Sequence, residues 1–280
     1  MTSYPFHLIN MFAERRLGGN PVVVFTTAEM PDEQTRQTLA YQMAVAETAF
    51  ISNTDTLVHV HSPQYALPFS SQALLSAAEA THPNEIGLAA QVFKTHLGET
   101  WLLRQGDRWW NQMNTPHTRQ SIHSVLEIAE ALSLNPKDIV GRPLFVDCGL
   151  EQLIVQVKSQ QSVLQANPQP QGLAKLAQSS KNLPQAAVWC RDDNQITLRF
   201  FSCDAFTVYE DFGSGTGAAN IAGWLLASGQ SAPFSLRIEQ GHTIHRLVSR
   251  LSVILVEVDE NRVIRVGGNA HRVGGGVIEL

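Results

Sequence analysis

Two alanine-rich segments, residues 72–81 and 218–227, are apolar on almost every side when they are drawn as helices. A helix that is apolar all round belongs in a core, because it needs apolar neighbours on every face. Runs typical of β-strands surround each segment, one set in each half of the chain. We therefore expect an α+β protein of two similar lobes, each with strands around one central buried helix, and a cleft between the lobes.

The boundary between the lobes is predicted near Pro116, where strand-like residues give way to a polar turn. The N-terminal lobe then covers residues 1–116 and the C-terminal lobe residues 117–265. The glycine-rich residues 266–280 are expected to add one or two last strands that return to the first lobe. A chain of 280 residues with 44% hydrophobic residues is sufficient for two such cores.

Three further segments have less distinctive patterns. A helix is predicted over residues 31–46, with Pro31 in its first position. Residues 102–113, which contain two tryptophans, are predicted to form a strand. The polar residues 160–185 are interpreted as a surface excursion that holds one short helix near residues 173–178.

Charge and composition exclude several classes of protein. The net charge is −5 and the basic residues do not cluster, which disfavours nucleic-acid binding. No apolar run reaches the roughly 18–20 residues that a membrane helix needs, and the first residues do not resemble a signal peptide. Three cysteines without a CxxC pair are typical of reduced thiols in a cytoplasmic protein, and Cys190 is predicted to be buried.

Two short stretches carry the candidate chemistry. Residues 46–50 place a single carboxylate, Glu47, among apolar and small residues, where burial raises a carboxyl pKa and suits the group to proton transfer. Residues 210–217 place two carboxylates before a glycine-rich turn that opens the second buried helix. Free N–H groups and the positive end of a helix suit anionic ligand groups. Together they predict an enzyme that moves a proton on a small carboxylate, without a metal or redox cofactor.

Each of these residues also has an ordinary structural interpretation. Glu47 is placed where a lone acid at a helix end often forms a salt bridge. Asp211 can serve as an acid that the helix dipole favours. Because two adjacent acids rarely face one pocket, Glu210 is predicted to be the structural one, hydrogen-bonded within its own lobe. Ser71 and Gln72 begin the first buried helix, where N-capping is the alternative to ligand binding.

Nucleotide and metal sites are not predicted. The glycine-rich turn lacks the lysine of a phosphate-binding P-loop, which disfavours ATP and GTP. His59 and His61 alternate on a strand and share one side, but no third ligand accompanies them. His242 and His245, three residues apart, also form a possible pair of metal ligands without an evident third ligand. All four are interpreted as structural histidines.

Six stretches, in this order along essentially the whole chain, resemble the PhzF-like phenazine biosynthesis family, which shares its fold with diaminopimelate epimerase. The stretches are Gly19 to Val24, Glu47 to Ile51, Ser62-Pro63 with Leu67-Pro68, Arg199-Phe200-Phe201, Glu210-Asp211 with Gly215, and Gln240-Gly241 with Arg246. Any one alone is weak, but six in sequence order are fairly specific.

The resemblance implies two lobes, each a β-barrel around a central helix, together with a homodimer and the absence of any cofactor. The family's characterised reaction is the isomerisation of trans-2,3-dihydro-3-hydroxyanthranilate by a glutamate that acts as base and then as acid. That glutamate corresponds to Glu47. The family's substrate-binding aspartate corresponds to Asp211, and its carboxylate-binding Gly-Ser pair corresponds to Gly215 and Thr216.

This chain departs from the family pattern at several positions. The family's Cys-Gly-His-Ala-Thr is replaced by residues 70–74, Ser-Ser-Gln-Ala-Leu, so that Gln72 stands in place of a histidine. Glutamine forms hydrogen bonds but does not titrate between pH 5 and 8. The proline that follows Glu-Asp in the family is replaced here by Phe212. Related epimerases use two thiols, and the equivalent positions here are Ser70 and Ser214, which argues against a two-thiol racemase.

The preferred hypothesis is a cofactor-independent isomerase acting on a small amino or cyclic carboxylate. Glu47 moves the proton, Asp211 binds the substrate, and a third set of residues holds the substrate carboxylate. That set is Ser71, Gln72, Ser214, Gly215 and Thr216. The alternative is a protein of the same fold that binds a small metabolite or serves as a dimeric partner without catalysis. An amino-acid epimerase is a weaker third hypothesis.

Overall fold

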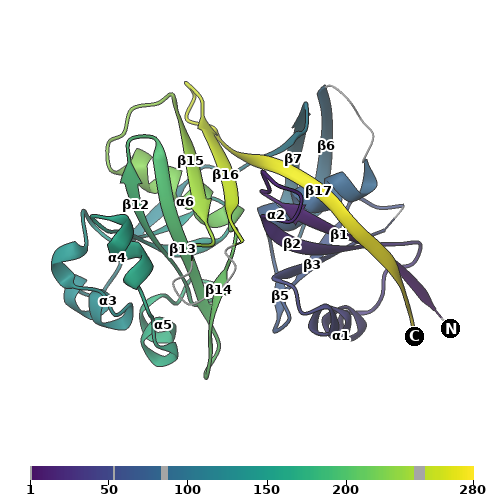
Figure 1. The fold of residues 1–280 in the computed structure, drawn as a ribbon, viewed down its shortest axis with the longest axis horizontal. Coiled ribbons are helices and arrows are strands. Elements are labelled where there is room, and N and C mark those ends of the chain that lie inside the picture. The colour runs from purple at the N-terminus through teal and green to yellow at the C-terminus, as the bar shows by residue number, and fades with distance from the viewer. Residues whose placement is uncertain (1, 53, 83–87, 243–249) are drawn as a thin grey trace. The chain divides into compact units, whose positions relative to one another are not determined.

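The computed structural model describes residues 2–52, 54–82, 88–242 and 250–280 (Figure 1). The chain divides into two compact units. Unit 1 comprises Met1–Gln112 and Val266–Leu280, and unit 2 comprises Met113–Arg265.

The described residues of unit 1 form two helices and a sheet-rich framework. Its strands are β1 (Ser3–Met11), β2 (Asn20–Thr27), β3 (Glu47–Ser52), β4 (Val58–His61), β5 (Ala66–Leu67), β6 (Leu88–Thr95), β7 (Gly98–Gln105), β8 (Arg108–Gln112) and most of β17 (Ile264–Glu279). Its helices are α1 (Glu33–Met43) and α2 (Ser71–Thr81).

The strands of unit 1 follow one another in a continuous series of pairings. β17 pairs with both β1 and β8, β1 pairs antiparallel with β2, and β2 runs parallel to β3. β3, β4 and β5 continue antiparallel, as do β6, β7 and β8. A single parallel bridge, Leu57 to Lys94, joins the residue before β4 to β6. The last strand, Ile264–Glu279, is therefore one long element, where the sequence indicated one or two strands over residues 266–280.

Helix α1 connects the parallel strands β2 and β3. It is shorter than the predicted segment 31–46 because Asp32 caps it, accepting a hydrogen bond from the Thr35 N–H at 2.7 Å, and Ala44 ends it in the left-handed conformation with φ 51°. Its Leu39 packs on the sheet beside Phe25 and Phe50, whose rings stack at 5.0 Å. One face of this sheet thus supports α1.

Helix α2 is the predicted central helix of unit 1. Residues Ser71 to Ala80 are all buried, and the helix contacts β1, β2, β3 and β8. Even its one acid is inside: Glu79 accepts a hydrogen bond from the Trp109 indole at 2.9 Å and lies 3.5 Å from the Arg104 guanidinium. Burial raises the pKa of Glu79, although Trp109 and Arg104 oppose the shift.

The raised pKa of Glu79 predicts a pH-dependent stability. The folded state binds this proton more tightly than the unfolded state, so the stabilisation is complete below the ordinary pKa of 4.5 and is lost as pH rises through the raised value. We expect the free energy of unfolding of Glu79→Gln to fall less between pH 4.5 and about pH 7 than that of wild type. Urea denaturation at both pH values measures it; parallel curves for the two proteins would contradict the assignment.

Unit 2 has five helical segments and eight strands among its described residues. The strands are β9 (His117–Gln120), β10 (Leu144–Asp147), β11 (Glu151–Gln156), β12 (Gln185–Asp192), β13 (Gln195–Cys203), β14 (Val208–Asp211), β15 (Phe234–Gln240) and β16 (Ser252–Val258). The helices are α3 (Val125–Ala131), η1 (Pro136–Asp138), α4 (Gln160–Gln165), α5 (Pro170–Leu176) and α6 (Gly215–Ala227).

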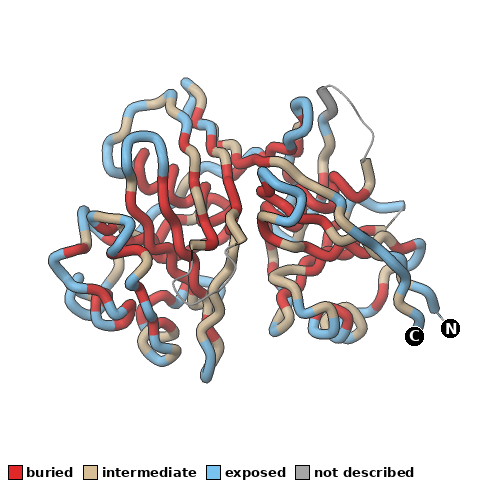
Figure 2. The backbone as a smooth tube through the Cα atoms, viewed as in Figure 1, coloured by how far each residue is buried: buried red, intermediate tan, exposed pale blue. Residues whose placement is uncertain are grey.

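The strands of unit 2 form a mixed sheet. β9, β10 and β11 are antiparallel, β11 runs parallel to β12, and β12 is antiparallel to β13. One end of β13 pairs with β15 and the other end with β14, while β15 pairs with β16. The tube in Figure 2 is coloured as buried along most of β12 and β13. This sheet carries the loop that leads into α6.

Helix α6 is the predicted central helix of unit 2. Residues Gly215 to Leu226 are buried, and the helix contacts β9, β10, β11 and β16. It begins three residues earlier than the apolar pattern indicated, because Ser214 caps it and accepts a hydrogen bond from the Gly217 N–H at 3.1 Å. The glycine-rich segment is therefore partly the first turn of the helix.

The interpretation of residues 160–185 is only partly confirmed: the predicted short helix near residues 173–178 corresponds to α5, but the segment is not a surface excursion. The segment forms two short helices, α4 and α5, and places Val163, Leu173, Leu176 and Ala177 in buried positions. Three of these residues join the apolar cluster that α3 and the sheet also supply. The polar residues between them raised the mean polarity of the segment, but the apolar side of each short helix still packs into the core.

Two smaller observations complete the fold. Cys148, Cys190 and Cys203 are buried free thiols, and burial raises the pKa of Cys203 to about 11. Among the residues that the structure describes, no helix has the length and apolar character needed to cross a membrane.

Candidate functional site

The predicted site residues of unit 1 gather at the start of α2. Glu47 is the first residue of β3, and Ser70 is the N-cap of α2. The Ser70 hydroxyl donates a hydrogen bond to Glu47 Oε2 and accepts one from the Ala73 N–H at 3.3 Å. The carboxylate is therefore attached, through one hydroxyl, to the positive end of a buried helix.

Gln72 lies in the first turn of the same helix and is almost fully buried. Its Oε1 accepts a hydrogen bond from Asn20 Nδ2 at 2.9 Å, which fixes the orientation of the amide. Within the described parts of the chain, Gln72 Nε2 and the Ser71 hydroxyl, both buried, have no hydrogen-bond partner. Because a buried donor without an acceptor is costly, these two groups are candidates to receive ligand atoms.

His59 and His61 have partners that fit the structural interpretation. His61 Nε2 accepts from Arg36 Nε at 3.3 Å, so its Nδ1 carries the proton and donates to Gln37 Oε1 at 2.9 Å. Burial and Arg36 lower the pKa of His61 to about 4. His59 contacts His96 with 3.2 Å between ring nitrogens, and burial and Arg36 lower its pKa to about 4 as well.

The predicted site residues of unit 2 gather at the start of α6. Asp211 ends β14, and the loop from Asp211 to Ser214 leads directly into the helix. The buried side chain of Gln240 bridges this loop: its Nε2 donates to the Asp211 carbonyl oxygen at 2.7 Å, and its Oε1 accepts from the Ser214 N–H at 2.9 Å. Gly241 follows with φ 102°, where a Cβ would lie 2.0 Å from the Arg250 carbonyl oxygen.

We expect Gln240→Leu to loosen the loop that carries Asp211. The substitution removes the hydrogen bonds that Gln240 makes to the Ser214 N–H and to the Asp211 carbonyl oxygen, and a buried group left unsatisfied costs about 1–3 kcal/mol. Amide hydrogen exchange of residues 211–217 should accelerate. Gln178→Leu, which removes an exposed amide–amide bond to Asn182, serves as control and should leave that exchange unchanged. Equal exchange in wild type and Gln240→Leu would contradict the bridging role.

A buried polar network supports the first turn of α6. The Thr216 hydroxyl lies 3.2 Å from that of Ser214 and accepts from Gln152 Nε2 at 3.1 Å. Gln152 Oε1 accepts from Asn220 Nδ2 at 2.8 Å, and Asn220 Oδ1 accepts from the Cys148 N–H at 2.8 Å. Strand β11 and the turn that contains Cys148 thus support Ser214 and Thr216 through this network. The N–H groups of a helix's first turn have no acceptor within the helix.

Glu210 has the structural role that the sequence indicated. Arg199 on β13 donates to its two carboxylate oxygens at 2.9 and 2.8 Å, and its Nη1 donates to the carbonyl oxygens of Leu164 and Ala166. The Arg199 guanidinium also lies over the Phe201 ring at 4.7 Å. Glu210 therefore forms an ion pair in the interior of unit 2, and Asp211 is the candidate for ligand binding.

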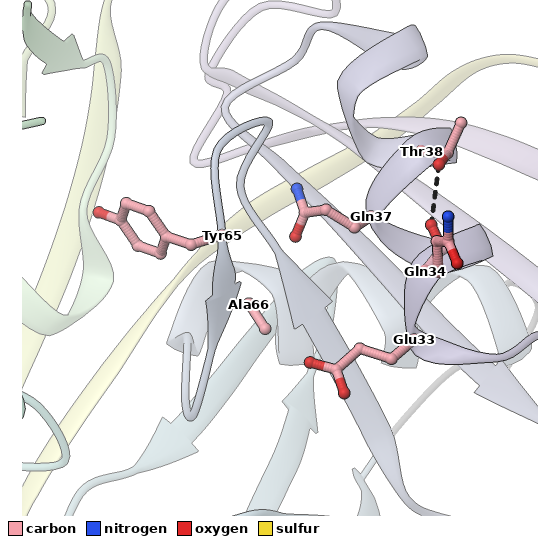
Figure 3. A pocket seen from close by; sticks show the side chains of 6 residues that line it. All are labelled: Glu33, Gln34, Gln37, Thr38, Tyr65 and Ala66. Carbon is pink, nitrogen blue, oxygen red and sulfur yellow. Dashed lines mark hydrogen bonds between the residues drawn. The ribbon is translucent and has the colours of Figure 1, made fainter.

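A pocket of about 610 Å³ lies elsewhere on unit 1, between α1 and β5 (Figure 3). It is lined by Glu33, Gln34, Gln37, Thr38, Tyr65 and Ala66. The Gln37 amide is already bonded to His61 and to the carbonyl oxygens of Ser62 and Pro63, and the Thr38 hydroxyl donates to the Gln34 carbonyl oxygen at 2.8 Å. None of the catalytic or substrate-binding residues that the sequence predicts lines this pocket.

Sequence reasoning missed the residues that orient the site. Asn20, Gln152 and Gln240 were not predicted to contact the site, although Asn20 and Gln240 each lie in one of the family-like stretches. Arg246 and His245 lie outside the described residues. In the described ranges, no group of three or more His, Cys, Asp or Glu side chains is arranged to hold a metal ion.

Known proteins are similar to this chain over nearly its whole length. The family model for phenazine biosynthesis-like proteins, PhzC-PhzF, matches residues 9–276. An uncharacterized isomerase of Pasteurella multocida is 29% identical over 282 residues, which covers 99% of this chain and 94% of that protein. The trans-2,3-dihydro-3-hydroxyanthranilate isomerase of Pseudomonas chlororaphis is 25% identical, with 98% of each chain covered.

A solved structure has the same fold. The crystal structure of a PhzF-family phenazine biosynthesis protein from Bacillus anthracis superposes with a TM-score of 0.81 at 18% identity, with 100% of both chains covered. The mixed, sheet-rich α+β fold is therefore shared, as the sequence predicted. Because the family model spans nearly the entire chain, this protein belongs to the phenazine biosynthesis-like (PhzF) family of isomerases.

Proposed function

We propose that this protein is a cofactor-independent isomerase that shifts a proton on a small amino or cyclic carboxylate, with Glu47 as the general acid and base. The observation that carries the proposal is the attachment of the Glu47 carboxylate, through Ser70, to the N-terminus of the buried helix α2. Rigid placement on a strand end and a helix end is what a proton-transfer group needs. The Pseudomonas chlororaphis relative, an isomerase of a cyclic amino carboxylate by its name, supports the substrate class.

The reaction needs one group that carries the proton in both directions. The ionised Glu47 removes a proton from a carbon that a neighbouring carboxylate or enamine activates. The electron pair of the broken C–H bond moves into the substrate's conjugated system. The protonated Glu47 then returns a proton to another carbon on the same face, and exchange of the Glu47 carboxyl proton with solvent before this return introduces deuterium when the reaction runs in D₂O. No oxidant, reductant or metal is required for this balance.

Donors in each unit are proposed to bind the substrate. In unit 1, the Ser71 hydroxyl and Gln72 Nε2 are buried donors that suit an acceptor such as a carboxylate oxygen. In unit 2, Asp211 binds an amine or hydroxyl, and the Ser214 hydroxyl with the first-turn N–H groups of Gly215 and Thr216 suit the substrate carboxylate. Donors fixed in advance at developing charge are commonly worth about 3–4 kcal/mol each.

Several finer features accompany this proposal. Each unit is proposed to be a β-barrel around its central helix, with residues 1–116 and 266–280 in one lobe and residues 117–265 in the other. The long series of strand pairings in unit 1 and its bridge from Leu57 to Lys94 support a closed barrel there. A homodimer is proposed from the family resemblance, and a cytoplasmic location is proposed from the three cysteines without a CxxC pair.

Solvent exchange tests the proposed function directly. Wild-type protein is incubated in D₂O with a panel of amino and cyclic carboxylates, including dihydro-hydroxyanthranilate, and proton NMR follows each C–H signal. Deuterium incorporation by wild type but not by Glu47→Gln supports the isomerase. An inverted stereocentre without bond migration identifies an epimerase. Ligand-induced shifts of protein signals without any exchange would identify a metabolite-binding protein instead.

A further inference from the structure

The hydroxyl of Ser70 has two contacts that together determine where its proton points. Ser70 is 4% exposed and immediately precedes α2. Its oxygen accepts the Ala73 N–H at 3.3 Å, and its single proton is donated to Glu47 Oε2. A hydroxyl has only one proton to donate. The carboxylate is therefore held by a donor that the helix itself keeps in one orientation.

The corresponding residue of unit 2 has a different partner. Ser214 caps α6 by accepting the Gly217 N–H at 3.1 Å, and its hydroxyl lies 3.2 Å from that of Thr216. Both central helices thus begin with a serine cap, but only the cap of α2 contacts a carboxylate in the part of the chain that the structure describes. Helix capping alone does not require the Glu47 contact, which therefore calls for a separate explanation.

We propose that Ser70 is the positioning residue of Glu47. It fixes the orientation of the carboxylate and stabilises its ionised form, so that Glu47 starts each turnover as a base. This inference rests on the proposed role of Glu47 as the proton-transfer group. A hydrogen bond to the charged form of a carboxylate favours that form, and a displacement of about 1 Å in a catalytic group can cost roughly 10²-fold in rate.

Three substitutions separate positioning from capping. Ser70→Ala removes both contacts. Ser70→Thr keeps a hydroxyl that can accept and donate. Ser70→Asp keeps a good N-cap acceptor but, when ionised, has no proton to donate and adds a like charge beside Glu47. Ser124→Ala is the matched control, because Ser124 caps α3 and accepts the Glu127 N–H at 3.3 Å, in a helix that carries none of the proposed site residues.

The first measurement needs no substrate. The side-chain carboxyl carbon of Glu47 is followed by ¹³C NMR through a pH titration of each protein. In Ser70→Ala and Ser70→Asp the carboxyl group should titrate at higher pH than in wild type, whereas in Ser70→Thr and Ser124→Ala it should titrate as in wild type. Superimposable titrations of wild type and Ser70→Ala would overturn the proposal, even if no substrate had been found.

The second measurement is turnover, as deuterium exchange into the substrate that the D₂O panel identifies. Ser70→Ala should lower kcat about 10- to 100-fold with KM within about 3-fold of wild type, and Ser70→Thr should restore most of kcat. Ser70→Asp should remain slow, because its carboxylate keeps the cap acceptor but, when ionised, donates no proton to Glu47. If Ser70→Asp regains the wild-type rate, the hydroxyl acts only as a cap and the proposal is wrong.

Glu47→Gln, assayed beside these variants, distinguishes a failure of the proposed role of Ser70 from a failure of the proposed function. An inactive Glu47→Gln with a fully active Ser70→Ala overturns the role of Ser70 and leaves the proposed function intact. A Glu47→Gln protein that exchanges at the wild-type rate overturns the proposed function itself, whatever Ser70→Ala does.

Discussion

Glu47→Gln is expected to lower kcat by about 10²–10⁴-fold while ligand affinity stays within a few-fold of wild type. Glutamine has nearly the same shape as glutamate and can still accept the hydrogen bond that Ser70 donates, so binding geometry is retained. It cannot take up a proton from carbon at neutral pH, so the chemical step is lost. Deuterium exchange by NMR gives kcat, and ligand titration of the same samples gives affinity.

The matched control for this experiment is Glu79→Gln. Glu79 is a second carboxylate of unit 1; it is buried, whereas Glu47 is half-buried, and it bonds to Trp109 and Arg104 rather than to Ser70. Its variant should change the pH dependence of stability and leave the exchange rate unchanged. If Glu47→Gln loses rate and affinity equally, Glu47 is a structural residue. If it keeps the full rate, another group is the base.

Arg199→Met is expected to destabilise unit 2 by about 3–5 kcal/mol. Arg199 and Glu210 are both largely buried, with 7% and 15% of their side-chain surface exposed, so removing the guanidinium leaves an uncompensated carboxylate in the interior. The carbonyl oxygens of Leu164 and Ala166 lose their donor as well. Urea denaturation followed by far-UV circular dichroism measures the loss.

A double-mutant cycle isolates the charge pair. Arg199→Met with Glu210→Leu removes both charges, so it should recover a substantial part of the stability that Arg199→Met alone loses. The orphaned carbonyl oxygens account for the remainder. Additive losses from the two single substitutions would mean that the pair does not couple, and would contradict the bidentate geometry. Because Glu210 adjoins Asp211, Arg199→Met should also accelerate amide exchange in the loop after β14.

The central helices could be predicted from sequence because burial on every side leaves an unambiguous pattern. The start of α6 could not, because glycine and threonine favour a turn by propensity while tertiary packing favours a helix. Gly217 and Gly223 are there for close packing: a Cβ on Gly217 would lie 3.0 Å from Phe200, and one on Gly223 would lie 2.9 Å from Val146. A sequence pattern does not distinguish this use of glycine from a flexible turn.

The structural role of Glu210 was predictable because adjacent strand residues point to opposite faces. The residues that orient the site were not, because they come from distant parts of the chain. Ser70 follows Glu47 by 23 positions, and Gln240 follows Ser214 by 26. Such contacts depend on strand pairing and helix placement, which composition and periodicity do not specify. The family-like motifs marked Gln240 as notable but gave no reason for it.

The long strand β17 has a consequence for synthesis on the ribosome. Its residues pair with β1 from Ser3 opposite Glu279 to Met11 opposite Ala270, and Thr2 and Leu280 exchange two backbone hydrogen bonds. All of unit 2 is translated between β8 and this strand. Unit 2 can therefore complete its fold during translation, whereas β1 lacks its pairing with β17 until residues 270–279 have emerged. Unit 1, which carries Glu47, thus begins to be translated before unit 2 and completes its sheet after it.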